Sequence, residues 1–234
     1  MQKLLFIHIP KTGGSTFRQH LRKVYGKDEV YFIYTHEAQE RHLQEAINSH
    51  APAISGHINW HAIASSGVLD YKPFLFTFIR RPQDQVISHF MHKRRGHKWS
   101  DRNQLTDDFR QFMATDWSKN WQSCVLSGLP RGQYHEPNVD ELQEMALRHL
   151  QQLDLCAGTD QLPQAVQWMK HHFAWKRTPL EDRNVSEKSH LVEVLHEVFD
   201  KQLKELNRAD HALYRYSKAK MKKAWDELPF WKRW

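Results

Sequence analysis

The segment KTGGST, residues 11–16, combines a lysine with two glycines and three hydroxyl side chains. It lies between a short apolar run and a stretch with helical spacing of apolar residues, so we expect it to join a strand to a helix. Glycine permits a tight turn, and Ser15 and Thr16 are candidates for the helix N-cap. Free amides and the dipole at a helix N-terminus favour an anion, and Lys11 adds positive charge there. The segment therefore predicts a phosphate site formed by Lys11, Thr12, Gly13, Gly14, Ser15 and Thr16.

A second candidate anion site follows the apolar run PFLFTFI at residues 73–79, which predicts a buried strand. Arg80 comes directly after this run, and Pro82 suits the first turn of the next helix, which would carry Ser88. A guanidinium fork matches phosphate oxygens, and a hydroxyl completes the binding shell. We therefore expect Arg80 and Ser88 to bind one phosphate group.

The elements that must position these residues are short apolar strands alternating with amphipathic helices. Apolar runs typical of parallel strands covered on both faces lie at 3–9, 29–34, 52–55, 73–79 and 153–157. Spacings of three or four predict helices at 15–25, 38–49, 105–115, 139–151, 162–173 and 190–206. The pattern predicts one α/β domain over residues 1–234: a three-layer, P-loop-like fold with a central parallel sheet flanked by helices and a helical C-terminal part.

Composition is that of an ordinary globular protein with an excess of positive charge. Hydrophobic residues make up 40% and charged residues 26% of the chain, and the formal net charge is +7. That charge favours a polyanionic partner, such as a phosphate, a sulfate, a nucleic acid or an acidic glycan. The only two cysteines, Cys124 and Cys156, predict free thiols in a reducing compartment rather than a disulfide.

The apolar start at residues 4–9 is too short for a signal peptide or a membrane span. We expect a cytoplasmic protein without stable membrane insertion. The alternative is a lumenal protein from which a membrane anchor has been trimmed. Neither clustered carboxylates nor a Cys/His spacing predicts a metal site.

Residues 8–17, HIPKTGGSTF, resemble the 5′-phosphosulfate loop of the carbohydrate sulfotransferases related to heparan sulfate 2-O- and 6-O-sulfotransferases. These enzymes use 3′-phosphoadenosine 5′-phosphosulfate (PAPS). Residues 76–88 resemble their 3′-phosphate motif, a strand followed by R-D-P-x-x-R-x-x-S, with Arg80 and Ser88 at its two phosphate ligands. Arg81 and Gln85 depart from the motif's Asp and second Arg, which removes a local ion pair and leaves open what holds the turn.

The resemblance implies transfer of a sulfuryl group from PAPS to a hydroxyl of an acceptor, first of all a carbohydrate, by in-line displacement without a metal. The loop amides would hold the 5′-phosphate and the sulfonate, and Lys11 would neutralise charge on the leaving oxygen. The product would be adenosine 3′,5′-bisphosphate (PAP).

A base must take the hydroxyl proton, and histidine titrates in the useful range. His57, in the segment SGHINW just past a predicted strand, matches the relatives' catalytic base. His61 is the second candidate, followed by His8 and His36.

Weaker matches add residues to this site. Asn184-Val185-Ser186 resembles a family segment near the nucleotide, which suggests contacts from Ser186 and Lys188. The basic run at residues 93–98, with Arg94 and Arg95, matches a stretch at the relatives' acceptor cleft. If the acceptor is acidic, this run would bind it; the other interpretation is a solvated helix end.

Two other functions compete with this hypothesis. A P-loop-like nucleotide kinase would need G-x-x-x-x-G-K-[ST] and a strand-end aspartate for Mg²⁺, but here Lys11 precedes the glycines. A non-catalytic module that binds nucleic acid or another polyanion is supported by the net charge alone. We therefore expect a hydroxyl-bearing acceptor and no nucleic-acid partner.

Overall fold

The computed structural model describes residues 2–35, 37–134, 137–176 and 190–230 of the chain. In these residues a five-stranded parallel sheet has the order β2-β3-β1-β4-β5. The strands are β1 (Leu4–Ile7), β2 (Val30–Ile33), β3 (Ala53–Gly56), β4 (Phe74–Ile79) and β5 (Leu155–Gly158). The helices are α1 (Gly14–Tyr25), α2 (Gln39–Asn48), α3 (Trp60–Ser65), α4 (Pro82–Lys93), α5 (Arg102–Met113), α6 (Trp121–Leu126), α7 (Val139–Gln152), α8 (Leu162–His172), α9 (His190–Leu206) and α10 (Arg208–Asp226).

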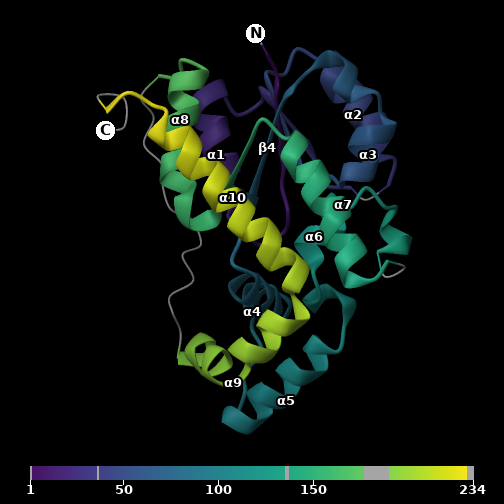
Figure 1. Cartoon of the computed structure of the whole chain (residues 1–234), viewed down its shortest axis with the longest axis vertical. Coiled ribbons are helices and arrows are strands. Elements are labelled where there is room, and N and C mark those ends of the chain that lie inside the picture. Colours follow the sequence, from purple (N-terminus) through teal and green to yellow (C-terminus); the bar gives the residue numbers. More distant parts are fainter. Residues whose placement is uncertain (1, 36, 135–136, 177–189, 231–234) are drawn as a thin grey trace.

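Both faces of the sheet are apolar. Helices α1 and α8 cover one face, and α2, α3, α6 and α7 cover the other (Figure 1). The alternation of side chains along a strand explains this, because in β1 Leu4 and Phe6 belong to one core and Leu5 and Ile7 to the other. The predicted three-layer α/β fold with a parallel sheet and a helical C-terminal part is confirmed.

A third apolar cluster joins α4, α5 and α9 beyond the carboxyl end of β4. Phe90, Phe109 and Phe199, one from each helix, lie at its centre, with ring centroids 4.9 Å and 5.1 Å from Phe109. The cluster holds α9, the first helix of the C-terminal part, against the helix that follows Arg80.

The predicted strands and helices lie within a few residues of the observed ones, but α3, α6 and α10 are not among the helices predicted from spacing, and the longest of these three is α10. Its buried side is formed by Ala209, Asp210, Leu213, Ser217 and Met221. Two of these five residues are polar. The buried residues of α10 therefore recur at helical spacing, but its apolar residues do not. Cys124 and Cys156 are buried and free, which confirms the expectation of free thiols.

The turn between β1 and α1 contains two left-handed residues. Lys11 has φ 69° and Gly13 has φ 84°. Gly13, rather than Ser15 or Thr16, is the N-cap of α1, and no side chain caps this end of the helix. The N-cap expectation for Ser15 and Thr16 is therefore wrong, because the left-handed glycine starts the helix earlier and puts both residues inside its first turn.

Gly14 is required because the ring of His8 lies against it. A Cβ at Gly14 would lie 1.8 Å from Cδ2 and 2.0 Å from Nε2 of His8. His8 comes directly after β1 and is buried, so its ring has little room to move. The absence of a side chain at Gly14 therefore leaves room for the ring of His8 beside the start of α1.

We predict that Gly14→Ala lowers the free energy of unfolding by about 1–3 kcal/mol, because it overpacks this contact. Urea denaturation followed by circular dichroism measures the effect. In the double variant Gly14→Ala/His8→Ala the loss should be smaller than the sum of the two single losses, since the ring is gone.

Gly132→Ala is the matched control, since a Cβ there would meet no atom within 4 Å. Equal stability of the Gly14→Ala and Gly132→Ala variants would contradict this account of the turn.

Candidate active site

The carboxyl end of each strand is followed at once by a polar residue, so that five of them line one edge of the sheet. In the spatial order of the strands they are Tyr34, His57, His8, Arg80 and Thr159. This is the edge at which open parallel sheets place their sites. The predicted strand ends thus bring together segments that are far apart in the sequence.

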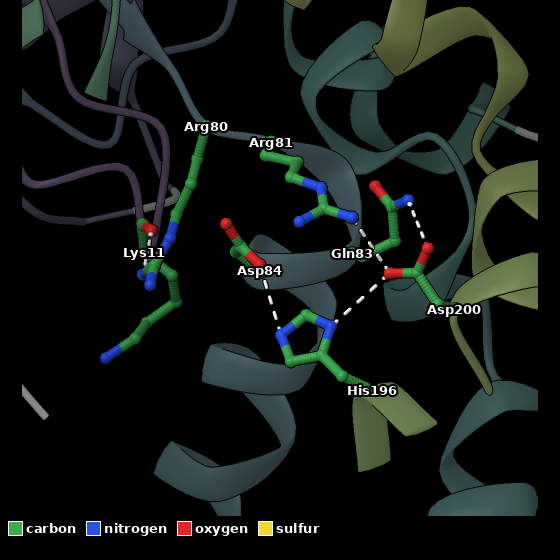
Figure 2. Close-up of polar contacts among 7 residues, drawn as sticks. All are labelled: Lys11, Arg80, Arg81, Gln83, Asp84, His196 and Asp200. Atoms are coloured by element: carbon green, nitrogen blue, oxygen red, sulfur yellow. Dashed lines mark hydrogen bonds and ion pairs between the residues drawn. The ribbon is translucent and has the colours of Figure 1, made fainter. Parts of the chain in front are cut away.

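The two predicted anion sites are in contact. Nη1 of Arg80 donates a hydrogen bond to the carbonyl oxygen of Lys11 at 3.1 Å (Figure 2). Nε2 of Gln85 donates to the carbonyl oxygen of Pro10 at 3.3 Å. Gln85 replaces the arginine of the family motif, and it ties the first turn of α4 to the loop before α1.

Thr12 supports the loop from inside. It is buried, its hydroxyl donates to the carbonyl of Ile9 at 2.8 Å, and its amide donates to the same oxygen at 3.4 Å. The hydroxyl of Thr159, just beyond β5, donates to the carbonyl of Thr12 at 3.2 Å. Both donors of Thr12 thus stabilise the turn, whereas the backbone from Gly13 to Thr16 forms the N-terminus of α1.

The side chains around the loop concentrate positive charge. Burial, together with the charges of Arg80 and Arg95, lowers the pKa of Lys11. The charge of Lys11 is in turn the largest cause that lowers the pKa of His92, on α4. Burial also lowers the pKa of Arg80, and only Asp84 opposes this. Cations that destabilise one another in this way fit a site for a polyanion, which would relieve their repulsion.

A buried network fixes the backbone of Arg80. The side chain of Gln122, on α6, accepts from the amide of Arg80 at 2.8 Å and donates to its carbonyl at 2.9 Å. Asp210, fully buried on α10, accepts from the amides of Gln122 at 3.1 Å and Ser123 at 2.7 Å. The Ser123 hydroxyl also donates to Asp210 at 2.6 Å. The C-terminal helix therefore positions Arg80 through α6.

His57 lies in a cluster of rings at the other side of the loop. Its ring centroid is 4.7 Å from that of His8 and 4.8 Å from that of Tyr34. The His57 amide donates to the carbonyl of Ile33 at 2.9 Å, and the His57 carbonyl accepts from Gln39 at 2.8 Å. These two bonds fix the backbone of His57 between β2 and α2.

His8 is held neutral within this cluster. Burial, reinforced by the charges of His57, Arg18 and Lys11, lowers the pKa of His8 to about 3. Nδ1 of His8 lies 3.3 Å from the hydroxyl of Tyr34. The guanidinium of Arg18 stands over the Tyr34 ring, 5.3 Å from its centroid. His8 is thus a neutral contact of His57 at pH 7.

The other predicted site residues lie around this centre or outside the described chain. Half-buried Ser88 lies on α4, and His61 is in the first turn of α3, outside the ring cluster. Arg95 is exposed after α4. The neighbouring Arg94 donates to both carboxylate oxygens of Asp108, at 2.7–3.1 Å. His36, Ser186 and Lys188 lie outside the residues that the structure describes.

Several residues of the site are not among the predicted site residues. Gln122, Asp210 and Tyr34 are the clearest. Tyr34 had a usable signal, because it ends a predicted strand at the same edge as His57. The roles of Gln122 and Asp210 depend on contacts between α6, α10 and β4, which no spacing in the sequence reveals.

The described residues contain no group of three or more His, Cys, Asp or Glu side chains that could hold a metal ion. Among the helices of that part of the chain, none combines the length and the apolar character needed to cross a membrane.

The family comparison covers most of the chain. The model of the sulfotransferase family matches residues 1–217, which include all five strands and both anion motifs. No curated protein shows a significant match. Since the family match spans far more than half of the sequence, the chain belongs to the sulfotransferase family.

Proposed function

We propose that this sulfotransferase moves a sulfuryl group from PAPS to a hydroxyl group of an acceptor, in the first place a carbohydrate. The observation that carries the proposal is the hydrogen bond from Arg80 to the Lys11 carbonyl, which joins two anion sites on neighbouring strands. PAPS carries phosphate at both ends of its ribose, so two adjacent anion sites suit it better than they suit a ligand with one phosphate.

In this proposal the start of α1 binds the 5′-phosphosulfate. The amides from Gly13 to Thr16 donate to its oxygens, and Lys11 adds a charge at the same place. Arg80 and Ser88 bind the 3′-phosphate, with the guanidinium as a charge-assisted donor. Ser186 and Lys188 are further contacts to the nucleotide, suggested by the resemblance of their segment alone.

The chain's own groups supply a base and preorganised positive charge. His57 takes the proton of the acceptor hydroxyl while the acceptor oxygen bonds to sulfur and the sulfur bond to the 5′-phosphate oxygen breaks. Lys11 and the loop amides stabilise the nonbridging and leaving oxygens, so no metal is required. As in phosphoryl transfer, positioning and electrostatics supply most of the rate. His8 stays neutral near pH 7 and leaves the proton to His57.

Arg95 is the better acceptor contact of the basic run. The charge of Arg95 lowers the pKa of Lys11, so its guanidinium is close to the loop. The guanidinium of Arg94, in contrast, is paired with Asp108. An acidic group on the acceptor would therefore meet Arg95 near the loop, and Arg94 would hold the end of α4 against α5.

The proposed role of Arg80 predicts a ligand-selective effect. Arg80→Ala should weaken binding of PAP by roughly 1.5–3 kcal/mol, because a charge-assisted hydrogen bond is lost. The loss for AMP, which lacks the 3′-phosphate, should be smaller, because for AMP only the support of the loop by the hydrogen bond to the Lys11 carbonyl is lost. Isothermal titration calorimetry without Mg²⁺ measures both ligands.

Arg148→Ala is the control, since Arg148 forms an exposed ion pair with Glu144 on α7. Equal losses of PAP and AMP affinity in the Arg80→Ala variant would mean that Arg80 does not bind the 3′-phosphate.

The proposed base predicts a pH profile. In the wild type, kcat/KM should fall at low pH with one protonation step. His57→Ala should lose this limb and roughly 10²–10⁴-fold in kcat, with PAPS binding near the wild-type value. Turnover of labelled PAPS with a panel of glycans, small alcohols and lipids identifies the acceptor for these measurements.

His61→Ala is the matched control, four residues further along the chain. Loss of activity in His61→Ala with full activity in His57→Ala would move the base to His61. An unchanged profile in both variants would exclude a histidine base from this segment.

A further inference from the structure

The first turn of α4 is held by α9 through a chain of charged groups, which Figure 2 shows. Nε2 of His196, on α9, lies 3.2 Å from the carboxylate of Asp84, and its Nδ1 lies 3.4 Å from that of Asp200. Arg81 donates to Asp200 at 3.0 Å, and Gln83 donates to it at 3.4 Å. This network replaces the ion pair of the family motif and explains what holds the turn after Arg80.

Asp84 connects this network to Arg80. Figure 2 shows its carboxylate between the side chains of Arg80 and His196. Burial acts to raise the pKa of Asp84, but the hydrogen bond with His196 and the charges of Arg80 and Arg81 outweigh it and lower the pKa. Asp84 is therefore ionised beside the guanidinium proposed to bind a phosphate. An unscreened carboxylate there would repel a phosphate dianion.

His196 is the group that offsets this carboxylate. Its hydrogen bond with Asp84 is the largest cause that raises the pKa of His196 above 6.5; Asp200 also raises it, and burial and Arg81 oppose it. Two cations of α5 also face α9: Arg102 forms an ion pair with Glu197, and Arg110 lies over the ring of Phe199.

On α10, two titratable groups are within electrostatic reach of the network. Tyr214 is near Asp84, and His211 is near Arg81 and Asp200. Burial, followed by nearby cations, lowers the pKa of His211, so His211 is neutral where His196 titrates.

We propose that His196 is a positioning residue for the 3′-phosphate of the nucleotide: its protonated ring holds Asp84 and offsets the carboxylate's charge beside Arg80. The inference rests on the proposed function, since it assumes that Arg80 binds this phosphate. The sign follows from the charges. While the ring is protonated, its positive charge offsets the negative charge of ionised Asp84, and the 3′-phosphate is bound tightly. As the pH rises through the raised pKa of His196, the ring loses its proton, the charge of Asp84 is no longer offset, and affinity falls.

The test is calorimetric titration of PAP and AMP into the wild type, His196→Gln, Asp84→Asn and the double variant, between about pH 6.5 and 8.5. Glutamine keeps a hydrogen-bond donor without the charge. The phosphates of the ligand titrate near pH 6 themselves. Comparing each variant with the wild type at the same pH cancels that contribution.

For PAP, His196→Gln should bind on the order of tenfold more weakly than the wild type at pH 6.5, which corresponds to a one-unit pKa change of His196 on binding. The difference between the two proteins should shrink as the pH rises towards 8.5. For AMP, they should not differ. Adding Asp84→Asn to His196→Gln should restore PAP affinity at pH 6.5. Asp84→Asn alone should bind PAP more tightly than the wild type at pH 8.5. His211→Gln, the matched control, should follow the wild type.

A His196→Gln defect that is the same at every pH, or that Asp84→Asn does not relieve, would overturn the inference and leave His196 a purely structural contact of α9. The Asp84→Asn variant decides the matter alone if His196→Gln does not fold: PAP affinity equal to the wild type at pH 8.5 would overturn it. Failure of the wild type to bind PAP at any pH would instead overturn the proposed function, and this inference with it.

Discussion

The hydrogen bond between the guanidinium of Arg80 and the carbonyl of Lys11 is the contact on which the candidate site depends. It exists because β1 and β4 are parallel neighbours, so that the residues after them meet at one edge. Gln122 fixes the backbone of Arg80, and buried Asp210 fixes the start of α6 that carries Gln122. The buried carboxylate of Asp210 on α10 thus helps to support the part-buried charge of Arg80.

The site has to keep several cations close together in a stable protein. Burial and the charges of Arg80 and Arg95 lower the pKa of Lys11, and the repulsion among these cations costs stability until an anion binds. The fold compensates with backbone contacts and one carboxylate, Asp84, whose charge is shared with His196. A stronger acidic partner beside Arg80 would stabilise the free protein but would compete with the phosphate. The same balance explains why the turn is held from its far side, by Arg81 and Asp200.

Much of the fold could be predicted because local pattern and global fold agree. The strands are apolar on both faces, and the turn at Gly13 needs a left-handed residue that the sequence supplies. The helix α10 could not be predicted from its spacing, since Asp210 and Ser217 occupy buried positions of its stripe. Nor could the roles of Gln122 and His196, which depend on contacts with segments 42 and 112 residues away. Lys11, Arg80 and His57 could be predicted as site residues because they follow predicted strands. The residues after parallel strands meet at one edge of the sheet, however the other segments pack.

The central claim is that one nucleotide bridges the start of α1 and Arg80. A crystal structure of the protein with PAP tests it most directly. The account predicts the 5′-phosphate at the amides from Gly13 to Thr16, beside Lys11, and the 3′-phosphate within hydrogen-bond distance of Arg80 and Ser88. A 3′-phosphate bound away from Arg80, or a nucleotide bound at another edge of the sheet, would contradict it.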